Sequence, residues 1–111
     1  METKNLKKKY LWASEKQLSV IKSGLEKGLD VKIYAKPEFN SSQMIVILWG
    51  LERYLDVEIY AKHEFNDYQM YEIRIGLQRE LNVKLYAYPE IPDTIMKKIR
   101  LKLQKTKSKG F

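Results

Sequence analysis

Cysteine is absent from this chain of 111 residues, and histidine occurs once. Without cysteine there can be no disulfide, thiolate metal ligand or cysteine nucleophile, and such a composition suits a reducing cytosol. Long hydrophobic runs are also missing, because the longest, from Met44 to Trp49, is far shorter than the roughly 18 residues of a membrane span. The basic start METKNLKKKYLWAS lacks the apolar core of a signal peptide. We therefore expect a cytoplasmic protein with no transmembrane segment.

Sequence patterns of catalysis and cofactor binding are missing as well. No P-loop, GxGxxG or GxSxG motif is present, and no histidine is placed to partner a serine. A metal site needs several His, Cys or carboxylate ligands that converge, and the one histidine, His63, stands where the flanking units have proline. The acidic residues recur in register with turns and caps. We therefore expect no catalytic residues, no metal and no cofactor, and hence no enzymatic activity.

The chain contains instead a segment that recurs every 26 residues. LDVKIYAKPEFNSSQM starts at Leu29, LDVEIYAKHEFNDYQM at Leu55 and LNVKLYAYPEIPDTIM at Leu81. Internal periods of this size are typical of supersecondary units that stack on one another. The pattern predicts a single domain over residues 1–111, with units at about 14–39, 40–65, 66–91 and 92–106 and a basic tail at 105–111.

Each unit opens with helix signals. Capping-box spacings appear three times, as Ser14-x-x-Gln17, Asn40-x-x-Gln43 and Asn66-x-x-Gln69. Apolar residues at spacings of three and four follow on one helical face, namely Leu18, Ile21, Leu25 and Leu29, then Met44, Ile47, Leu51 and Leu55, then Met70, Ile73, Leu77 and Leu81. The pattern predicts helices near 15–29, 41–55, 67–81 and 94–106. A glycine beside each apolar stripe, at positions 24, 50 and 76, indicates close approach of a neighbouring backbone.

The return segment between helices shows a different period. Val31, Ile33 and Ala35 alternate with Lys32 and Tyr34, which predicts an extended path with Tyr34 on the outward side. Two architectures accommodate this pattern. We favour a mainly α fold, a small array of tandem helix-plus-extended-segment repeats. The alternative is a two-layer α/β fold in which short parallel strands lie under a helix layer.

The unit QMxxIxxGLxxxLDVxxYAxPEF resembles a short tandem repeat found in proteins of Firmicutes and of their phages and other mobile elements. The resemblance covers residues 14–104. It implies a bacterial or phage setting and a non-enzymatic role. Small proteins of that setting include inhibitors of host defence, anti-CRISPR proteins among them, so the resemblance also suggests a defence nucleoprotein as a target.

Basic residues gather at the two ends of the chain, which has a formal net charge of +7. Residues 17–93 hold nine basic and twelve acidic residues, whereas residues 94–111 hold seven basic residues and no acid. The candidates for nucleic-acid binding are Lys97, Lys98, Arg100, Lys102, Lys105, Lys107 and Lys109, and the first five would line the outer side of the last helix. Contact with an anionic membrane surface and a merely solvated polar cap are the alternatives.

A second candidate surface is apolar. Ile45 and Trp49 in the second unit and Tyr71 and Ile75 in the third lie on the helix side away from the core stripe, so they would form a contiguous patch. The alternative is that the return segments cover this side. We predict a module that binds a protein or a protein–nucleic-acid complex, with a nucleic-acid-binding protein as the alternative and self-association through open repeat ends as a third possibility.

Overall fold

The fold is mainly α, as the sequence predicts. A computed structural model describes the backbone of residues 3–108 and the side chains of residues 5–108. Its α-helices are α1 (Thr3–Lys9), α2 (Glu15–Glu26), α3 (Ser41–Glu52), α4 (Asp67–Gln78) and α5 (Asp93–Ser108), and its short 3-10 helices are η1 (Val31–Ile33), η2 (Val57–Ile59) and η3 (Val83–Leu85). Residues 3–108 contain no β-strand, so the two-layer α/β alternative is wrong.

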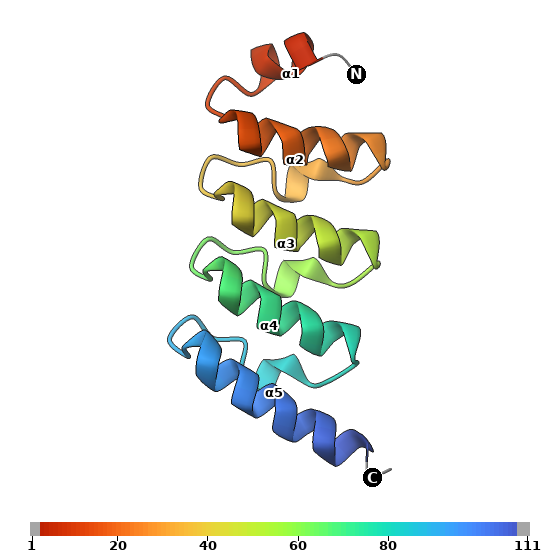
Figure 1. Cartoon of the computed structure of the whole chain (residues 1–111), viewed down its shortest axis with the longest axis vertical. Helices are drawn as coiled ribbons and strands as arrows, with labels where there is room; N and C mark the ends of the chain where they lie inside the picture. Colours follow the sequence, from red (N-terminus) through yellow and green to blue (C-terminus); the bar gives the residue numbers. More distant parts are fainter. Residues whose placement is uncertain (1–2, 109–111) are drawn as a thin grey trace.

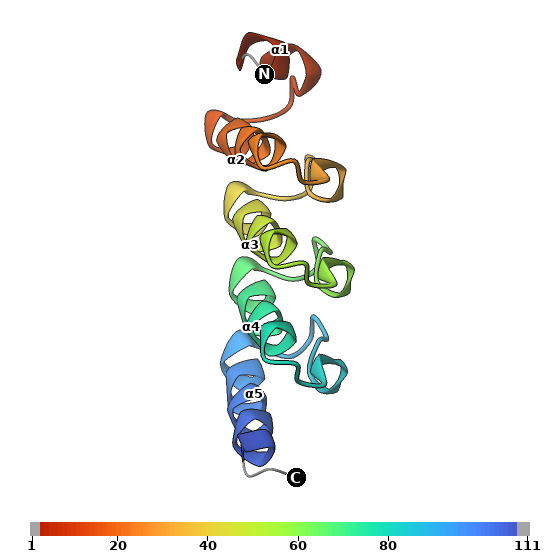
Figure 2. The same ribbon diagram turned by 90° about the vertical axis from the view of Figure 1, so that its right-hand side faces the viewer.

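The helices stack in chain order, each beside the next, into an elongated array of 52 × 26 × 16 Å. Figure 1 shows α2 to α5 side by side, with α1 and α5 at opposite ends of the array. In Figure 2, α2 to α5 form one layer and the 3-10 segments between them form a second. The short helix α1, which the sequence analysis did not predict, places Leu6 in a fully buried position.

The predicted capping boxes are present at α2, α3 and α4. In each, the side chain of the N-cap residue accepts from the backbone of a glutamine, whose own side chain accepts from the N-cap backbone. That glutamine also donates to the residue just before the next N-cap: Gln17 to the carbonyl of Phe39 at 2.8 Å, and Gln43 to that of Phe65 at 2.7 Å. One side chain thus caps the start of a helix and holds the end of its own unit, directly before the next helix.

The helices end earlier than the stripe predicts. α2, α3 and α4 stop at Glu26, Glu52 and Gln78, because two residues later the chain takes a left-handed conformation. The residues there are Gly28 (φ 71°), Tyr54 (φ 57°) and Glu80 (φ 57°). Glycine adopts this conformation without strain, whereas tyrosine and glutamate do not. The chain therefore turns back before the last stripe residue, and Leu29 and Leu55 pack against the core from outside the helix.

The return segments are 3-10 helices, so the predicted extended path is wrong. The Asp30 carboxylate accepts from the backbone of Lys32 at 3.2 Å, which favours a tight turn over an extended chain at η1. The turn changes which side chains face inward. Tyr34, which the alternation placed outside, is fully buried, as are Tyr60 and Tyr86 at the matching positions.

The buried tyrosines explain the recurring glycines. Their hydroxyls donate to helix carbonyls: Tyr34 to Val20 at 2.6 Å, Tyr60 to Val46 at 2.7 Å, and Tyr86 to Glu72 at 2.7 Å. A Cβ on Gly24, Gly50 or Gly76 would overlap the oxygen of the nearby tyrosine. It would also crowd the valine that begins the 3-10 helix directly before that tyrosine. The close neighbour is therefore a side chain and not a backbone, contrary to our prediction.

Replacing Gly50 tests this contact. Gly50→Ala should lower the free energy of unfolding by about 2 kcal/mol, because overpacking against Tyr60 and Val57 outweighs the better helix propensity of alanine. Tyr60→Phe should cost about 1 kcal/mol for its lost hydrogen bond. In the double variant the two losses should not add, since phenylalanine leaves more room for the new methyl group. Urea denaturation followed by circular dichroism measures all three, and simple additivity would contradict this explanation.

The strain at Tyr54 gives a second prediction. This side chain is 94% exposed, so its removal should cost little packing, whereas its positive φ disfavours any residue with a Cβ. Tyr54→Gly should raise the free energy of unfolding by about 1 kcal/mol. Tyr54→Ala is the matched control, because it removes the ring but keeps the Cβ. Thermal and urea unfolding should rank glycine above alanine, and equal stability of the two variants would show that Tyr54 is not strained.

Candidate functional site

The candidate site is a groove of about 390 Å³ between α3 and α4. Its lining residues are Ser42, Ile45, Val46, Trp49, Asp67, Tyr68 and Tyr71. The helix pairing thus brings together three of the four predicted apolar residues, Ile45, Trp49 and Tyr71. Ile75 is partly exposed but does not line the groove.

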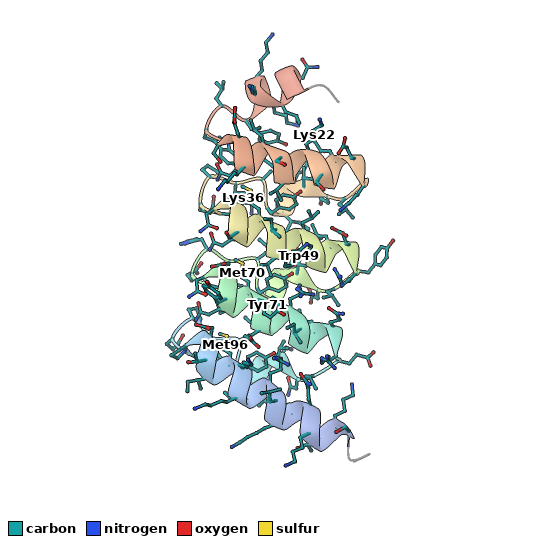
Figure 3. The ribbon with its side chains drawn as sticks, in the orientation of Figure 1. Lys22, Lys36, Trp49, Met70, Tyr71 and Met96 are labelled. Atoms are coloured by element: carbon teal, nitrogen blue, oxygen red, sulfur yellow. The ribbon has the colours of Figure 1, made fainter. Side chains whose placement is uncertain are left out.

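The aromatic walls of the groove are open to solvent. Trp49 is 40% exposed, Tyr71 41% and Tyr68 67%. Figure 3 shows Trp49 and Tyr71 on the neighbouring helices α3 and α4. Only residues of α3 and α4 line the groove, and its aromatic side chains are exposed, so the alternative in which the return segments cover this side is wrong. Sequence reasoning missed Tyr68, although it stands three residues before Tyr71 and thus on the same helix face.

Arg74 lies behind the two aromatic walls. The centre of its guanidinium is 5.5 Å from the ring centroid of Trp49 and 5.3 Å from that of Tyr71, within cation–π range of both. The residue is only 8% exposed, and its Nη1 donates to Gln78 at 2.8 Å. Burial lowers the pKa of Arg74 from its ordinary value, and the charge of nearby Arg53 lowers it further. Two positive charges therefore stand close together beside Trp49 and Tyr71, although neither arginine lines the groove itself.

In the next interface along the array, the equivalent arginine has a carboxylate partner. Arg100 of α5 is equivalent to Arg74, one unit later, and its Nε donates to the Glu72 carboxylate at 2.7 Å. Val46 stands at the position equivalent to Glu72 for Arg74. The Nε of Arg74 is accordingly buried without a hydrogen-bond partner, and no ion pair to Arg74 forms within residues 5–108. This arginine has a buried charge with aromatic neighbours but no carboxylate.

The predicted basic surface on α5 is smaller than the sequence suggests. Its exposed members are Lys97, Lys98, Lys102, Lys105 and Lys107. Our placement of Arg100 on the outer side is wrong, because it is 7% exposed and paired with Glu72. Lys107 donates to the carbonyl of Arg79 at 2.8 Å and so helps to bind the end of α4. Lys109 lies outside the described residues.

Neither a metal-ligand cluster nor a membrane-spanning helix is found in the part of the chain that the structure describes. Between residues 3 and 108, no three His, Asp or Glu side chains come together as metal ligands would. His63 is exposed, and its Nε2 lies 3.4 Å from Oε1 of the neighbouring Glu64. No described helix has both the length and the apolar character needed to cross a bilayer.

Comparison with protein-family models, with curated proteins and with solved structures finds no match for this chain.

The two equivalent arginines allow a matched stability test. Arg74→Met should leave the free energy of unfolding unchanged or raise it by about 1 kcal/mol, because the variant removes a buried charge that has no carboxylate. Leu48, one unit earlier, shows that an aliphatic side chain is accommodated there. Arg100→Met should instead cost about 3 kcal/mol, since it leaves Glu72 buried and unpaired. Chemical denaturation compares the two, and equal losses would mean that Arg74 is structural.

Proposed function

We propose that this chain is a non-enzymatic protein-interaction module that binds its target through the groove between α3 and α4. The observation that carries the proposal is the solvent-exposed aromatic wall of Trp49, Tyr68 and Tyr71 on a helical scaffold. Trp, Tyr and Arg dominate the binding energy of protein interfaces; Trp and Tyr line this groove, and Arg74 stands next to both rings. Apolar surface that a folded protein leaves open to water favours association with a partner.

The scaffold supports this function because it holds the aromatic side chains without using them for stability. The core of each unit is formed by the buried tyrosine, the capping glutamine and the apolar stripe, which all face away from the groove or lie between helices. Trp49, Tyr68 and Tyr71 stand outside this core and can thus serve recognition at little cost to folding, whereas Val46 belongs to both groove and core. Ser19 and Ser23 occupy the positions of Ile45 and Trp49 in the preceding unit, so the aromatic surface is specific to α3 and α4.

The biological setting of the proposal rests on the resemblance of the 26-residue unit to tandem repeats of Firmicutes and their phages. In that setting the target would be a larger protein inside the bacterial cell, and a defence nucleoprotein is the class that we propose. An anti-CRISPR-like inhibitor would act by occupying a surface of its target and would need no catalytic group.

Nucleic-acid binding through α5 is the second candidate function. Lys97, Lys98, Lys102 and Lys105 are exposed on this helix, and residues 94–111 contain no acidic residue to offset them. Such a surface would bind phosphates with little sequence preference, and the affinity would fall steeply with salt. Binding in the aromatic groove would depend much less on salt.

The test is affinity capture from a Firmicutes lysate with nuclease treatment and a high-salt wash. The wild-type chain should retain a discrete protein, and Trp49→Ala/Tyr71→Ala should weaken that binding about 30-fold or more, because truncation of a central aromatic costs about 2 kcal/mol or more. Leu85→Ala/Tyr88→Ala is the matched control, since these side chains are 57% and 50% exposed but lie outside the groove. It should bind as the wild type does.

Two outcomes would contradict the groove as the binding surface. Retention of the protein by Trp49→Ala/Tyr71→Ala would place the interface elsewhere. Recovery of nucleic acid alone, released by salt and lost when Lys97, Lys98, Lys102 and Lys105 are all replaced by serine, would favour the second candidate. Circular dichroism of each variant verifies that it is folded before its binding is compared.

A further inference from the structure

The two neighbouring helix interfaces differ by one carboxylate. Between α4 and α5, Glu72 supplies an acceptor to the Nε of Arg100 at 2.7 Å. Between α3 and α4, the residue at the Glu72 position is Val46, and Val46 lines the groove. The space that a carboxylate fills in one interface is therefore next to the open groove in the other, while the arginine is kept in both.

We propose that the groove accepts a segment of a partner protein that places a carboxylate next to an apolar side chain. The partner's Asp or Glu would take the part that Glu72 plays for Arg100, and the apolar side chain would pack between Trp49 and Tyr71. This inference rests on the proposed function and adds the chemistry of the partner. It makes Arg74 a specificity residue, since an apolar groove without it would not distinguish an acid from its amide.

Charge complementarity favours an acidic partner at this place. Arg74 is buried without a carboxylate, and exposed Arg53, whose guanidinium donates to the Trp49 carbonyl at 3.0 Å, adds a second positive charge nearby. Hydrogen bonds between charged partners are stronger than neutral ones, and stronger still where aromatic side chains exclude water. A single buried carboxylate from a partner would therefore bind tightly and selectively.

A nucleic-acid strand fits the same surface less well. Bases can stack on aromatic rings beside arginine, but the groove also contains Asp67 at the start of α4, about 10 Å along the helix from Arg74. Residues 17–93 carry nine basic and twelve acidic residues, so a polyanion lying along these units would meet a net negative charge. One carboxylate at the Arg74 end avoids both sources of repulsion.

The experiment uses two matched pools of capped pentapeptides on the full-length chain. Both pools carry Leu, Phe or Trp beside the central residue, which is Glu in one pool and Gln in the other. The peptides retained by the immobilised protein are counted by mass spectrometry. The wild type should enrich the Glu pool over the Gln pool about tenfold, as expected for a charge-assisted bond at a partly buried arginine.

Two variants separate Arg74 from the general positive charge of the protein. Arg74→Gln should bring the ratio of Glu to Gln peptides close to one, because it removes the cation. Val46→Glu keeps Arg74 and rebuilds the Glu72–Arg100 arrangement inside the chain, so it should also abolish the preference. Lys84→Gln is the control with the same loss of charge on the exposed surface of η3, and it should keep the tenfold ratio.

Equal retention of both pools by the wild type would overturn the carboxylate inference. A preference for Glu that persists in Arg74→Gln and Val46→Glu would also overturn it, and would assign the effect to net charge. Displacement of the Glu peptides by a single-stranded oligothymidylate from the wild type but not from Trp49→Ala would replace the peptide with a nucleic acid. None of these results requires the captured protein of the preceding test, so the two proposals can fail separately.

Discussion

The hydrogen bond from a buried tyrosine to a helix carbonyl is the interaction on which this architecture depends. It fixes a 3-10 return segment against the preceding helix, and it is possible only because a glycine leaves the space beside that carbonyl empty. Burial raises the pKa of Tyr34, Tyr60 and Tyr86 well above the ordinary tyrosine value, so the hydroxyls keep their protons at physiological pH. The glutamine of each capping box then holds the start of its helix against the residue just before the next helix, which sets the spacing between helices.

Recognition and stability are assigned to different sides of the same helices. The stripe of α3 and α4 lies in the core, while Trp49 and Tyr71 face the groove on the outer side of the helical layer. Arg74 stands at the border between the two. Its counterpart Arg100 has a carboxylate and belongs to the structure, whereas Arg74 has aromatic neighbours and an unpaired Nε. The same residue type at the same position in two successive units can therefore serve two purposes.

Sequence reasoning predicted what depends on local pattern. The caps at Ser14, Asn40 and Asn66, the helix starts and the inner stripe follow from spacing, and so does the meeting of Ile45, Trp49 and Tyr71 on one side. It did not predict the inward turn of the return segments or the pairing of Arg100. The alternation around Tyr34 is that of a strand. The ring turns inward because Gly24 has no Cβ and leaves room for the tyrosine hydroxyl. The pairing of Arg100 with Glu72 across 28 residues left no signal in a lysine-rich segment.

The hydrogen bonds that hold each unit together and join it to its neighbour link residues that are close in sequence. The tyrosine, glutamine and arginine hydrogen bonds span 14, 22 and 28 residues. Closing such small loops costs little chain entropy, so an array of this kind folds quickly, by nucleation in one pair of units and propagation to its neighbours. Unfolding starts at the two ends of the array, where a helix has a neighbour on one side only. α3 and α4, like α2, have neighbours on both sides, so the groove is carried by interior helices that open only after an end of the array has opened.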